Sequence, residues 1–411
     1  MSISILLFSQ YFPPEMGALA ARSYEHGLRW VQMGHHVTVI CGTPNYPDGK
    51  IYKGFRNRLF QRQNVNGIDV IRTWVLPKPN RNAWERITNY TSYFITALLA
   101  GFRVRKPDIV IGSSPQLLSG LAGYLVARIR KVPFVLEIRD LWPESIAESG
   151  PTDNALLLRV LRWIAHFLYR RADRIVVVAD PSKEWLGRIP RVDKEGIRVV
   201  PNGIDLALFD SENCEGEDIR REFGLGRKFL VSYIGGIGAA HGIGTVLEAA
   251  DRLRREPDVT FLLVGDGAER EELQQECMRR RLDNVVFTGK QPREKVVSFL
   301  EASDVSLVLL RKREVFKTVI PSKMLESMAM ANPIILGVEG EAKRILEEAE
   351  AGIAITPENA EELVVAIERL KNDSEFRREL TKNGREYVRQ WYDRDKLAAV
   401  YVLVLEELVV A

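Results

Sequence analysis

Continuous apolar segments of strand length recur along the whole chain, and helical segments separate them. Strands that are apolar throughout, rather than at every second residue, are typical of parallel sheets buried on both faces. The first half has such segments at Ile3–Ser9, 35–42, Asp108–Gly112, Pro133–Ile138 and Arg174–Val178. The second half has them at Phe229–Ile234, Val259–Val264, Asn284–Phe287, Val305–Leu310, Pro333–Leu336 and Gly352–Ile355. The pattern predicts an α/β protein of two Rossmann-like doubly wound domains that face a cleft.

The length and the charge of the chain agree with two packed domains. Its 411 residues exceed the ~100–200 residues of one ordinary domain. The 58 basic residues nearly balance the 55 acidic ones, so the composition does not favour a nucleic-acid partner. We expect an N-terminal domain, 1–205, a C-terminal domain, 206–392, and a last helix, 393–411, that crosses back onto the first. The acidic segment Asp210–Arg221 is the expected crossing between the domains.

The cysteines and the hydropathy pattern predict a cytoplasmic protein. Cys41, Cys214 and Cys277 are widely spaced and form no metal-binding pair, which is typical of reduced thiols. The segment MSISILLFSQ lacks the basic start of an export signal. The longest apolar helical run, Tyr93–Phe102, is about half of the ~20 residues that span a membrane. We therefore expect a protein that does not cross the membrane but can lie on its inner face.

Two segments have alternative interpretations. The irregular stretch 44–82 is either a binding loop or a short antiparallel excursion that covers one sheet edge. The helix Leu156–Arg171 mixes Trp163 and Phe167 with several arginines. It is either a core helix with a solvated basic face or a surface helix whose aromatic side enters lipid headgroups. The apolar helix expected at 83–104 is a second candidate for contact with the membrane.

Three loops combine features that suit a phosphate group. Gly17 follows the first strand, a glycine-rich turn over 235–242 precedes a helix, and Pro321 opens another helix. Free amides at a helix start attract anions, and Lys323 would add a formal charge there. Each loop alone is equally compatible with ordinary turn chemistry. Because ligands of doubly wound sheets bind at the carboxyl ends of strands, the three loops together favour a diphosphate held between the domains.

Two further groups of residues are candidates for chemistry. The tight turns 264–267 and 285–289 could read a base edge or could simply join strand to helix. The charged cluster Glu137–Glu144 directly follows an apolar strand, where charges need partners or a use. Arg139 and Asp140 are therefore either a structural ion pair or a site in which the carboxylate orients a hydroxyl acceptor and the guanidinium binds an anionic group.

The ordered set of motifs resembles glycosyltransferase family 4 enzymes of the GT-B fold. The resemblance is nearest to a bacterial surface-polysaccharide branch that includes L-fucosamine (FucNAc) transferases, and it covers nearly the whole chain. It is carried by QYFPPEMG, EIRDLWPES, VPNGID, YIGGIGAAHG, LLVGDG, VVFTGK and PSKMLESMA.

The resemblance implies roles for individual residues. Glu326 matches the family glutamate that binds the ribose hydroxyls, and Ser322 and Lys323 fall where main-chain amides meet the diphosphate. Phe287 to Lys290 fall where the backbone contacts the base. Gly17 would approach the phosphates from the first domain, and Asp140 matches the acidic position of the acceptor-side motif.

The chain also departs from the family pattern. Thr318 stands where a glutamate often contacts the donor sugar, and Arg139 stands where many relatives have a histidine. Gly236 and His241 replace the usual arginine and lysine of the phosphate loop. Positive charge must then come from Lys323, His241 and Lys317.

These features predict a retaining, metal-independent glycosyltransferase that uses no cofactor beyond its nucleotide-sugar substrate. The expected donor is a UDP-linked, N-acetylated sugar, and the expected acceptor is a polyprenyl-diphosphate-linked saccharide in O-antigen or other surface-polysaccharide synthesis. Helix starts, Lys323 and His241 can stabilise a departing diphosphate without a metal ion. Two alternatives stay open: a UDP-N-acetylglucosamine 2-epimerase-like enzyme of the same architecture, and a non-catalytic nucleotide-sugar-binding protein.

Overall fold

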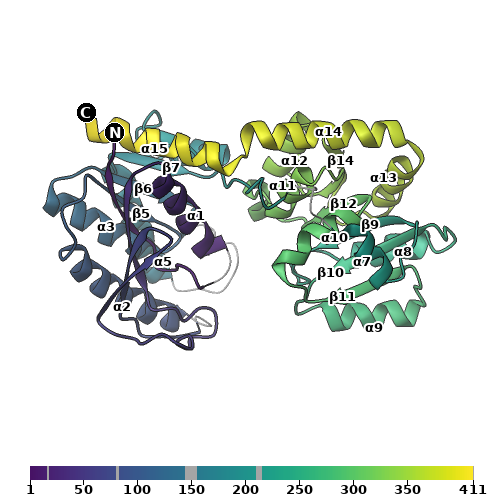
Figure 1. Cartoon of the computed structure of the whole chain (residues 1–411), viewed down its shortest axis with the longest axis horizontal. Helices are drawn as coiled ribbons and strands as arrows, with labels where there is room; N and C mark the ends of the chain where they lie inside the picture. Colours follow the sequence, from purple (N-terminus) through teal and green to yellow (C-terminus); the bar gives the residue numbers. More distant parts are fainter. Residues whose placement is uncertain (16–17, 80–82, 144–154, 210–214, 411) are drawn as a thin grey trace. The chain divides into compact units, whose positions relative to one another are not determined.

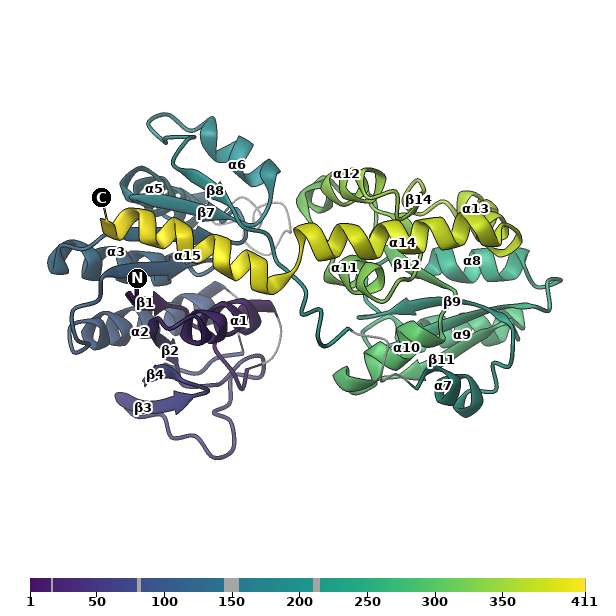
Figure 2. The same cartoon turned by 45° about the horizontal axis from the view of Figure 1, so that its top comes forward.

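The structure is a computed structural model that describes residues 1–15, 18–79, 83–143, 155–209 and 215–410. The chain divides into two compact units, Met1–Asn202 with Asp395–Ala411 and Gly203–Arg394. Each unit is a mainly parallel sheet with helices on both faces (Figure 1, Figure 2), as the repeated strand pattern predicts. The chain passes between the units at Asn202 and Gly203, so the crossing predicted over 210–221 was wrong. Of that segment, residues 210–214 lie outside the described chain, and helix α7 (Gly216–Glu222) belongs to the second unit.

The sheet of the first unit has eight strands in the order β3-β4-β2-β1-β5-β6-β7-β8. All neighbouring strands are parallel except β3 and β4. The strand order reverses between β1 and β5, which is where doubly wound sheets bind ligands. The strands are β1 (Ser4–Phe8), β2 (His36–Gly42), β3 (Phe60–Val65), β4 (Ile68–Thr73), β5 (Ile109–Ser113), β6 (Phe134–Ile138), β7 (Arg174–Val177) and β8 (Ile197–Val199).

Strands β3 and β4 occupy part of the irregular stretch 44–82. They form an antiparallel hairpin, and β4 pairs with β2, so the hairpin covers one sheet edge. This confirms the second of the two interpretations of the stretch for residues 60–73. Asn66 and Gly67 turn the hairpin with positive φ angles of 50° and 88°. An Asn-Gly pair between strands favours this type of turn, and it is the signal from which the hairpin could have been predicted.

Helices cover both faces of this first sheet. Side chains of α2, α3 and α5 pack on one face, whereas α1 and the C-terminal helix α15 pack on the other. Helix α2 ends three residues before the predicted Val104. The helices are α1 (Ala18–Gln32), α2 (Ala83–Gly101), α3 (Leu117–Arg130), α5 (Ala155–Arg171), α6 (Asp180–Gly187) and α15 (Arg394–Val410).

The second unit has a six-stranded parallel sheet in the order β11-β10-β9-β12-β13-β14. Counted within the unit, this is the order 3-2-1-4-5-6 of dinucleotide-binding sheets, with its switch point between β9 and β12. The strands are β9 (Phe229–Ile234), β10 (Val259–Val264), β11 (Val285–Gly289), β12 (Val305–Leu309), β13 (Ile334–Gly337) and β14 (Gly352–Ala354). Its other helices are α8 (Gly244–Arg252), α9 (Arg270–Arg280), α10 (Val296–Ala302), α11 (Ser322–Ala329), α12 (Glu341–Glu348), α13 (Ala360–Asn372) and α14 (Ser374–Trp391), with short 3₁₀ turns at Arg293–Lys295 and Glu314–Thr318.

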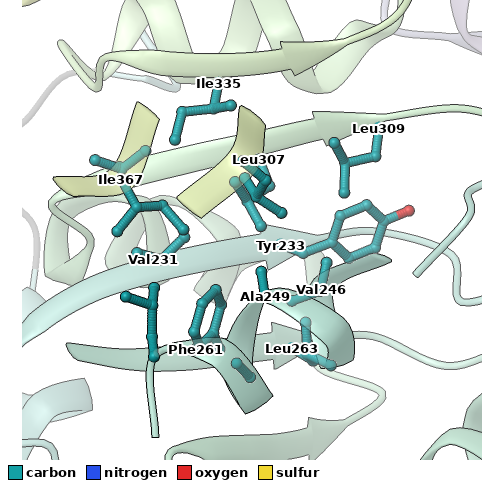
Figure 3. Close-up of a cluster of buried hydrophobic side chains, with 14 of the residues drawn as sticks. Val231, Tyr233, Val246, Ala249, Phe261, Leu263, Leu307, Leu309, Ile335 and Ile367 are labelled. Carbon is teal, nitrogen blue, oxygen red and sulfur yellow. The ribbon is translucent and has the colours of Figure 1, made fainter. Parts of the chain in front are cut away.

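Alternate residues of the central strands build the core of the second unit (Figure 3). Val231 and Tyr233 of β9 face the same cluster as Phe261 of β10 and Leu307 of β12. Helix α8 adds Val246 and neighbouring side chains to this cluster. The apolar faces therefore fix the register of the strands, and the ends of β9 and β12 come to lie at the switch point.

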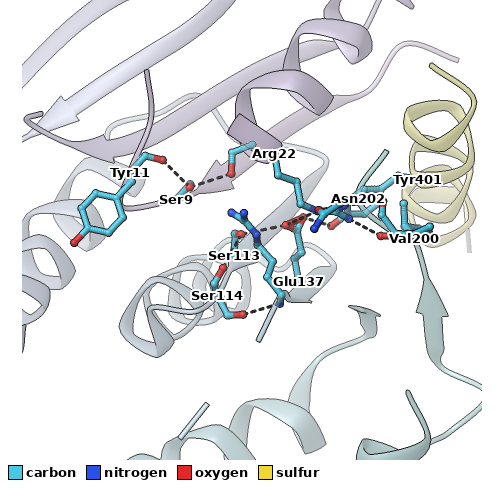
Figure 4. Close-up of polar contacts among 12 residues, drawn as sticks. Ser9, Tyr11, Arg22, Ser113, Ser114, Glu137, Val200, Asn202 and Tyr401 are labelled. Carbon is cyan, nitrogen blue, oxygen red and sulfur yellow. Dashed lines mark hydrogen bonds and ion pairs between the residues drawn. The ribbon is translucent and has the colours of Figure 1, made fainter. Parts of the chain in front are cut away.

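A buried carboxylate holds the first unit together (Figure 4). Glu137, at the end of β6, accepts hydrogen bonds from Arg22 Nε (3.2 Å), Ser113 Oγ (3.1 Å) and Tyr401 Oη (3.3 Å). Arg22 also donates to the carbonyls of Val200 (2.8 Å) and Pro201 (3.0 Å). This network joins α1, β6 and α15 to the segment that leads out of the first unit.

Replacing Glu137 tests this network. Glu137→Ala leaves the buried Arg22 without its carboxylate, so we expect the free energy of unfolding to fall by about 3–5 kcal/mol. Urea denaturation followed by tryptophan fluorescence measures the change. Glu386→Ala is the matched control, because Glu386 lies in an exposed pair with Lys382 and should cost less than about 1 kcal/mol. Equal losses in both variants would contradict the structural role of Glu137.

Candidate functional site

Several of the predicted donor-side residues lie around the start of α11. Pro321 precedes the helix in an extended conformation, and Ser322 is the first helical residue. The first amides of a helix lack intrahelical acceptors and face outward from its N-terminus. Helix α11 follows β12, while the glycine-rich turn follows β9, so both predicted phosphate loops lie at the switch point of this sheet.

Lys323 lies over the glycine-rich turn. Its Nζ donates a hydrogen bond to Tyr233 Oη (2.8 Å) and lies 4.1 Å from the centre of the Tyr233 ring. A Cβ atom at Gly235 would lie 2.9 Å from the same Nζ, and Gly235 has a φ of +150°. Glycine at this position therefore makes room for the ammonium group.

Burial changes the charge state of these groups. It lowers the pKa of Lys323 to about 8, and the nearby Glu326 opposes part of that change. Burial and the charge of Lys323 also lower the pKa of His241, whose Nδ1 lies 3.3 Å from the Gly238 carbonyl oxygen. His241 is therefore mainly neutral at pH 7, so it can offer a ring N–H but little positive charge.

Neighbouring glycine loops interlock by their backbones. Gly235 N–H donates to the Val264 carbonyl (2.9 Å), and Ile237 N–H donates to the Asp266 carbonyl (2.9 Å). A Cβ at Gly265 would lie 1.9 Å from the Gly235 carbonyl oxygen, so a larger residue cannot fit without moving the loop. Gly265 N–H donates in turn to the Gly289 carbonyl (3.0 Å). The turn 264–267 thus has a structural role, which was one of the two interpretations of its sequence.

Glu326 lies one turn along α11 from Lys323. Burial raises the pKa of its carboxyl group, while the charges of Arg293, Lys323 and Arg394 lower it. Within the described part of the chain, no hydrogen bond or ion pair ends on this carboxylate. A small cavity of about 10 Å³ lies beside Lys323 and Glu326. A half-buried carboxylate without a described protein partner can accept hydrogen bonds from a ligand.

The other residues predicted to bind the donor include Gly236, Phe287 and Lys290. Gly236 belongs to the glycine-rich turn, and its carbonyl accepts a hydrogen bond from Tyr233 Oη (2.7 Å). Phe287 is half-buried in the middle of β11, and Lys290 is exposed directly after the strand. The backbone contact of Gly289 with Gly265 brings this strand end beside the glycine loops.

Lys317 and Thr318 lie in the 3₁₀ turn that precedes α11. Lys317 Nζ pairs with Glu314 (2.7 Å) and Glu339 (3.7 Å), so two carboxylates already surround its charge. Thr318 is exposed, and its hydroxyl contacts the Val315 carbonyl (3.4 Å). Of the three predicted sources of positive charge, Lys323 alone combines a half-buried position beside the glycine loops with freedom from an ion pair to a described carboxylate.

On the first unit, Arg139 and Asp140 follow β6. Arg139 N–H donates to Ser114 Oγ (2.9 Å), and burial lowers the pKa of its guanidinium. The surrounding protein desolvates Asp140 and raises its pKa, while the charge of Arg139 opposes the rise. Within the described ranges no ion pair or hydrogen bond ends on the Asp140 carboxylate. The interpretation of the two residues as a structural ion pair was therefore wrong.

Gly17, the predicted phosphate contact of the first unit, lies outside the described residues. Glu15, two residues before Gly17, is a functional candidate that the sequence did not reveal. Its carboxylate accepts hydrogen bonds from the N–H groups of Phe12 (3.3 Å), Asn45 (2.9 Å) and Tyr46 (3.0 Å). Burial raises its pKa to about 7, against the effect of these donors. Glu15 thus ties the loop after β1 to the loop after β2.

Among the residues that the structure describes, no group of three or more His, Cys, Asp or Glu side chains could hold a metal ion. In the same ranges, no helix combines the length and the apolar character needed to cross a membrane.

Comparisons with known proteins identify the class of the chain. Residues 17–203 match the glycosyl transferase 4-like domain, and residues 215–387 match the glycosyl transferases group 1 family. The chain is a glycosyltransferase with the GT-B fold. This confirms the predicted fold and the predicted enzyme class. The finer likeness to FucNAc transferases stays a prediction.

Individual relatives cover most of the glycosyltransferase. The colanic acid biosynthesis glycosyl transferase WcaI, so named, of Escherichia coli K12 is 26% identical over 375 residues, which are 89% of this chain and 91% of that protein. The alpha-D-kanosaminyltransferase of Streptomyces kanamyceticus is 27% identical over 68% of this chain and 72% of that protein. The solved structure of Anabaena Alr3699/HepE in complex with UDP has a TM-score of 0.72 at 17% identity, over 99% of this chain and 100% of that one.

Sequence reasoning missed Tyr233, which contacts both Lys323 and the glycine-rich turn. Its place in the apolar strand FLVSYI marks it as a core residue, and its ring is indeed in the core. The available signal was a hydroxyl-bearing aromatic residue at the carboxyl end of the strand, where it needs a hydrogen-bond partner.

Proposed function

We propose that the enzyme is a retaining, metal-independent glycosyltransferase that moves a sugar from a nucleoside diphosphate, of which UDP is the favoured one, to a lipid-linked saccharide. The observation that carries the proposal is the position of Lys323 and Glu326 one turn apart at the start of α11, beside interlocked glycine loops. A cation and free amides suit a diphosphate, and a carboxylate without a partner one turn away suits the ribose hydroxyls. The Anabaena structure with UDP and the name of WcaI, from colanic acid biosynthesis, support a UDP donor and a role in surface-polysaccharide synthesis such as that of O-antigen.

The proposed chemistry stabilises the leaving group rather than a covalent intermediate. The bond between the sugar and the phosphate oxygen breaks, and the acceptor oxygen forms the new glycosidic bond on the same face. The acceptor proton passes to the departing phosphate oxygen. Lys323 and the α11 amides would hold the growing negative charge in a partly buried site, where such contacts are strongest. His241 would add a neutral N–H donor.

Asp140 would orient the acceptor hydroxyl on the first unit, with Arg139 binding an anionic group of the acceptor. Burial raises the pKa of Asp140, which agrees with a desolvated carboxylate that can accept a hydrogen bond from a hydroxyl. Transfer then requires the acceptor on the first unit to reach the sugar held by the second.

A donor and product assay tests the proposal. Titration calorimetry with UDP, GDP and their sugars should single out one base, and proton NMR of the product should show the anomeric configuration of the donor. UDP-N-acetylglucosamine without acceptor should stay unchanged, whereas a 2-epimerase would release UDP and N-acetylmannosamine. Inversion at the anomeric carbon, or the absence of any nucleotide binding, would contradict the proposal.

The pKa of Lys323 predicts how donor affinity varies with pH. An anionic diphosphate binds the protonated ammonium, which the free enzyme loses above a pKa of about 8. The affinity for UDP should therefore be constant near pH 7 and about tenfold weaker at pH 9. Lys323→Arg should remove this decline, because a guanidinium stays charged over the whole range. A wild-type affinity that does not change between pH 7 and 9 would exclude Lys323 as the phosphate cation.

Replacement of Asp140 separates acceptor chemistry from donor binding. We expect Asp140→Ala to lower kcat by about 10²–10³-fold, within the range for a positioned acid–base group. The affinity for UDP should change less than about threefold. Glu184→Ala is the control on the same unit, because Glu184 lies on α6 in an exposed pair with Lys194. Full turnover by Asp140→Ala with normal donor binding would remove Asp140 from the mechanism.

A lipid-linked acceptor would place the enzyme at a membrane surface. Helix α5 exposes Leu156 (69%), Val160 (46%) and Trp163 (68%) at helical spacing, beside Arg159. The remainder of α5 packs through Ala165 and Leu168 into the core, so the helix is both a core helix and an amphipathic surface helix. Apolar and aromatic side chains next to arginine suit a bilayer of anionic lipid at the inner face of the membrane.

Liposome flotation tests this contact. The double variant Leu156→Ser, Trp163→Ser should lose most of its binding to vesicles that contain anionic lipid. Val365→Ser on α13 removes a similarly exposed apolar residue from the second unit, so it should bind like the wild type. Absence of wild-type flotation with anionic vesicles would remove the membrane from the proposal.

A further inference from the structure

The hydroxyl of Tyr233 joins two parts of the donor site. It donates a hydrogen bond to the Gly236 carbonyl (2.7 Å) and accepts one from Lys323 Nζ (2.8 Å). Figure 3 shows the ring within the core cluster and the hydroxyl pointing away from the other labelled side chains. One buried side chain thus contacts both the turn after β9 and the lysine of α11.

The Lys323 ammonium group lies close to both the Tyr233 ring and the Gly235 backbone. Its Nζ lies over the Tyr233 ring, and a Cβ at Gly235 would approach it to 2.9 Å. The Tyr233 ring itself is fully buried, and it packs edge-on against His241 at a ring distance of 6.1 Å. A rigid aromatic side chain therefore orients a lysine that has four rotatable bonds and would otherwise lose much conformational freedom on binding a ligand.

We infer that Tyr233 is a positioning residue that locks Lys323 and the glycine-rich turn into one preformed clamp for the second phosphate of a nucleoside diphosphate. The inference rests on the proposed function, because it concerns the same donor site. Tyr233 acts through Lys323 and Gly236 and does not itself contact the phosphate.

The charge distribution explains why the clamp matters here. Gly236 has no side chain, His241 is mainly neutral, and Lys317 is paired with Glu314 and Glu339. Among the predicted phosphate cations, Lys323 therefore has no described substitute. A variant in which Lys323 is no longer held in this orientation should therefore bind the second phosphate more weakly.

The substitution Tyr233→Phe removes the hydroxyl and keeps the buried ring. We expect the fold to persist, with a thermal midpoint close to that of the wild type. The Kd for UDP should rise about tenfold, as for the loss of a hydrogen bond to a charged group, whereas the Kd for UMP should change less than about threefold. Calorimetry with both nucleotides measures the ratio of the Kd values for UMP and UDP. A general loss of packing would leave this ratio unchanged. Tyr387→Phe is the matched control, because that hydroxyl contacts Glu348 (3.2 Å) in the same unit.

A double-mutant cycle completes the test. If Tyr233 acts through Lys323, the substitution Tyr233→Phe should cost little further UDP affinity in a Lys323→Ala background. Fully additive losses, or an unchanged preference for UDP over UMP in folded Tyr233→Phe, would overturn the inference and leave the proposed function intact. A wild-type enzyme that binds neither nucleotide would overturn both.

Discussion

The proposed donor site depends on close backbone contact between the loops that follow β9 and β10. A Cβ at Gly265 would lie 1.9 Å from the Gly235 carbonyl oxygen, so the loop after β10 needs glycine to pack at this distance. The contact places the turn 235–242 against the strand end on one side and against Lys323 on the other. Because β9 and β12 flank the switch point of the sheet, the same packing brings α11 and its Glu326 to the turn.

The first unit uses buried charge in place of close backbone packing. Glu137 and Arg22 are 115 residues apart in sequence, yet each is almost fully buried against the other. Such a pair adds little net stability, but removal of either partner is costly, so the pair fixes one arrangement of β6, α1 and α15. Asp140 follows Glu137 by three residues, and the network therefore also fixes the strand end from which this carboxylate, the proposed acceptor-side group, extends.

The sequence predicts much of the fold because parallel strands such as 259–264 are apolar throughout and cannot be mistaken for exposed ones. It also predicts the loops of the donor site, since glycine runs and Pro321-Ser322-Lys323 are local signals. Contacts between residues far apart in the chain are harder to predict from the sequence. Tyr233 resembles any other core residue of its strand. The hydrogen bonds of Glu15 with Asn45 and Tyr46 join two loops that are separate in the sequence. Lys317 is the opposite example. Its position in the sequence suggests a cation that binds phosphate, but in the structure it pairs with Glu339.

The central claim is that α11 and the glycine loops of the second unit bind a nucleoside diphosphate. A crystal structure of the enzyme with UDP tests it most directly. The account predicts an oxygen of the second phosphate within hydrogen-bonding distance of Lys323 Nζ, the ribose hydroxyls on the Glu326 carboxylate, and the Tyr233–Lys323 contact preserved. A nucleotide bound elsewhere, or one whose phosphates point away from Lys323, would contradict it.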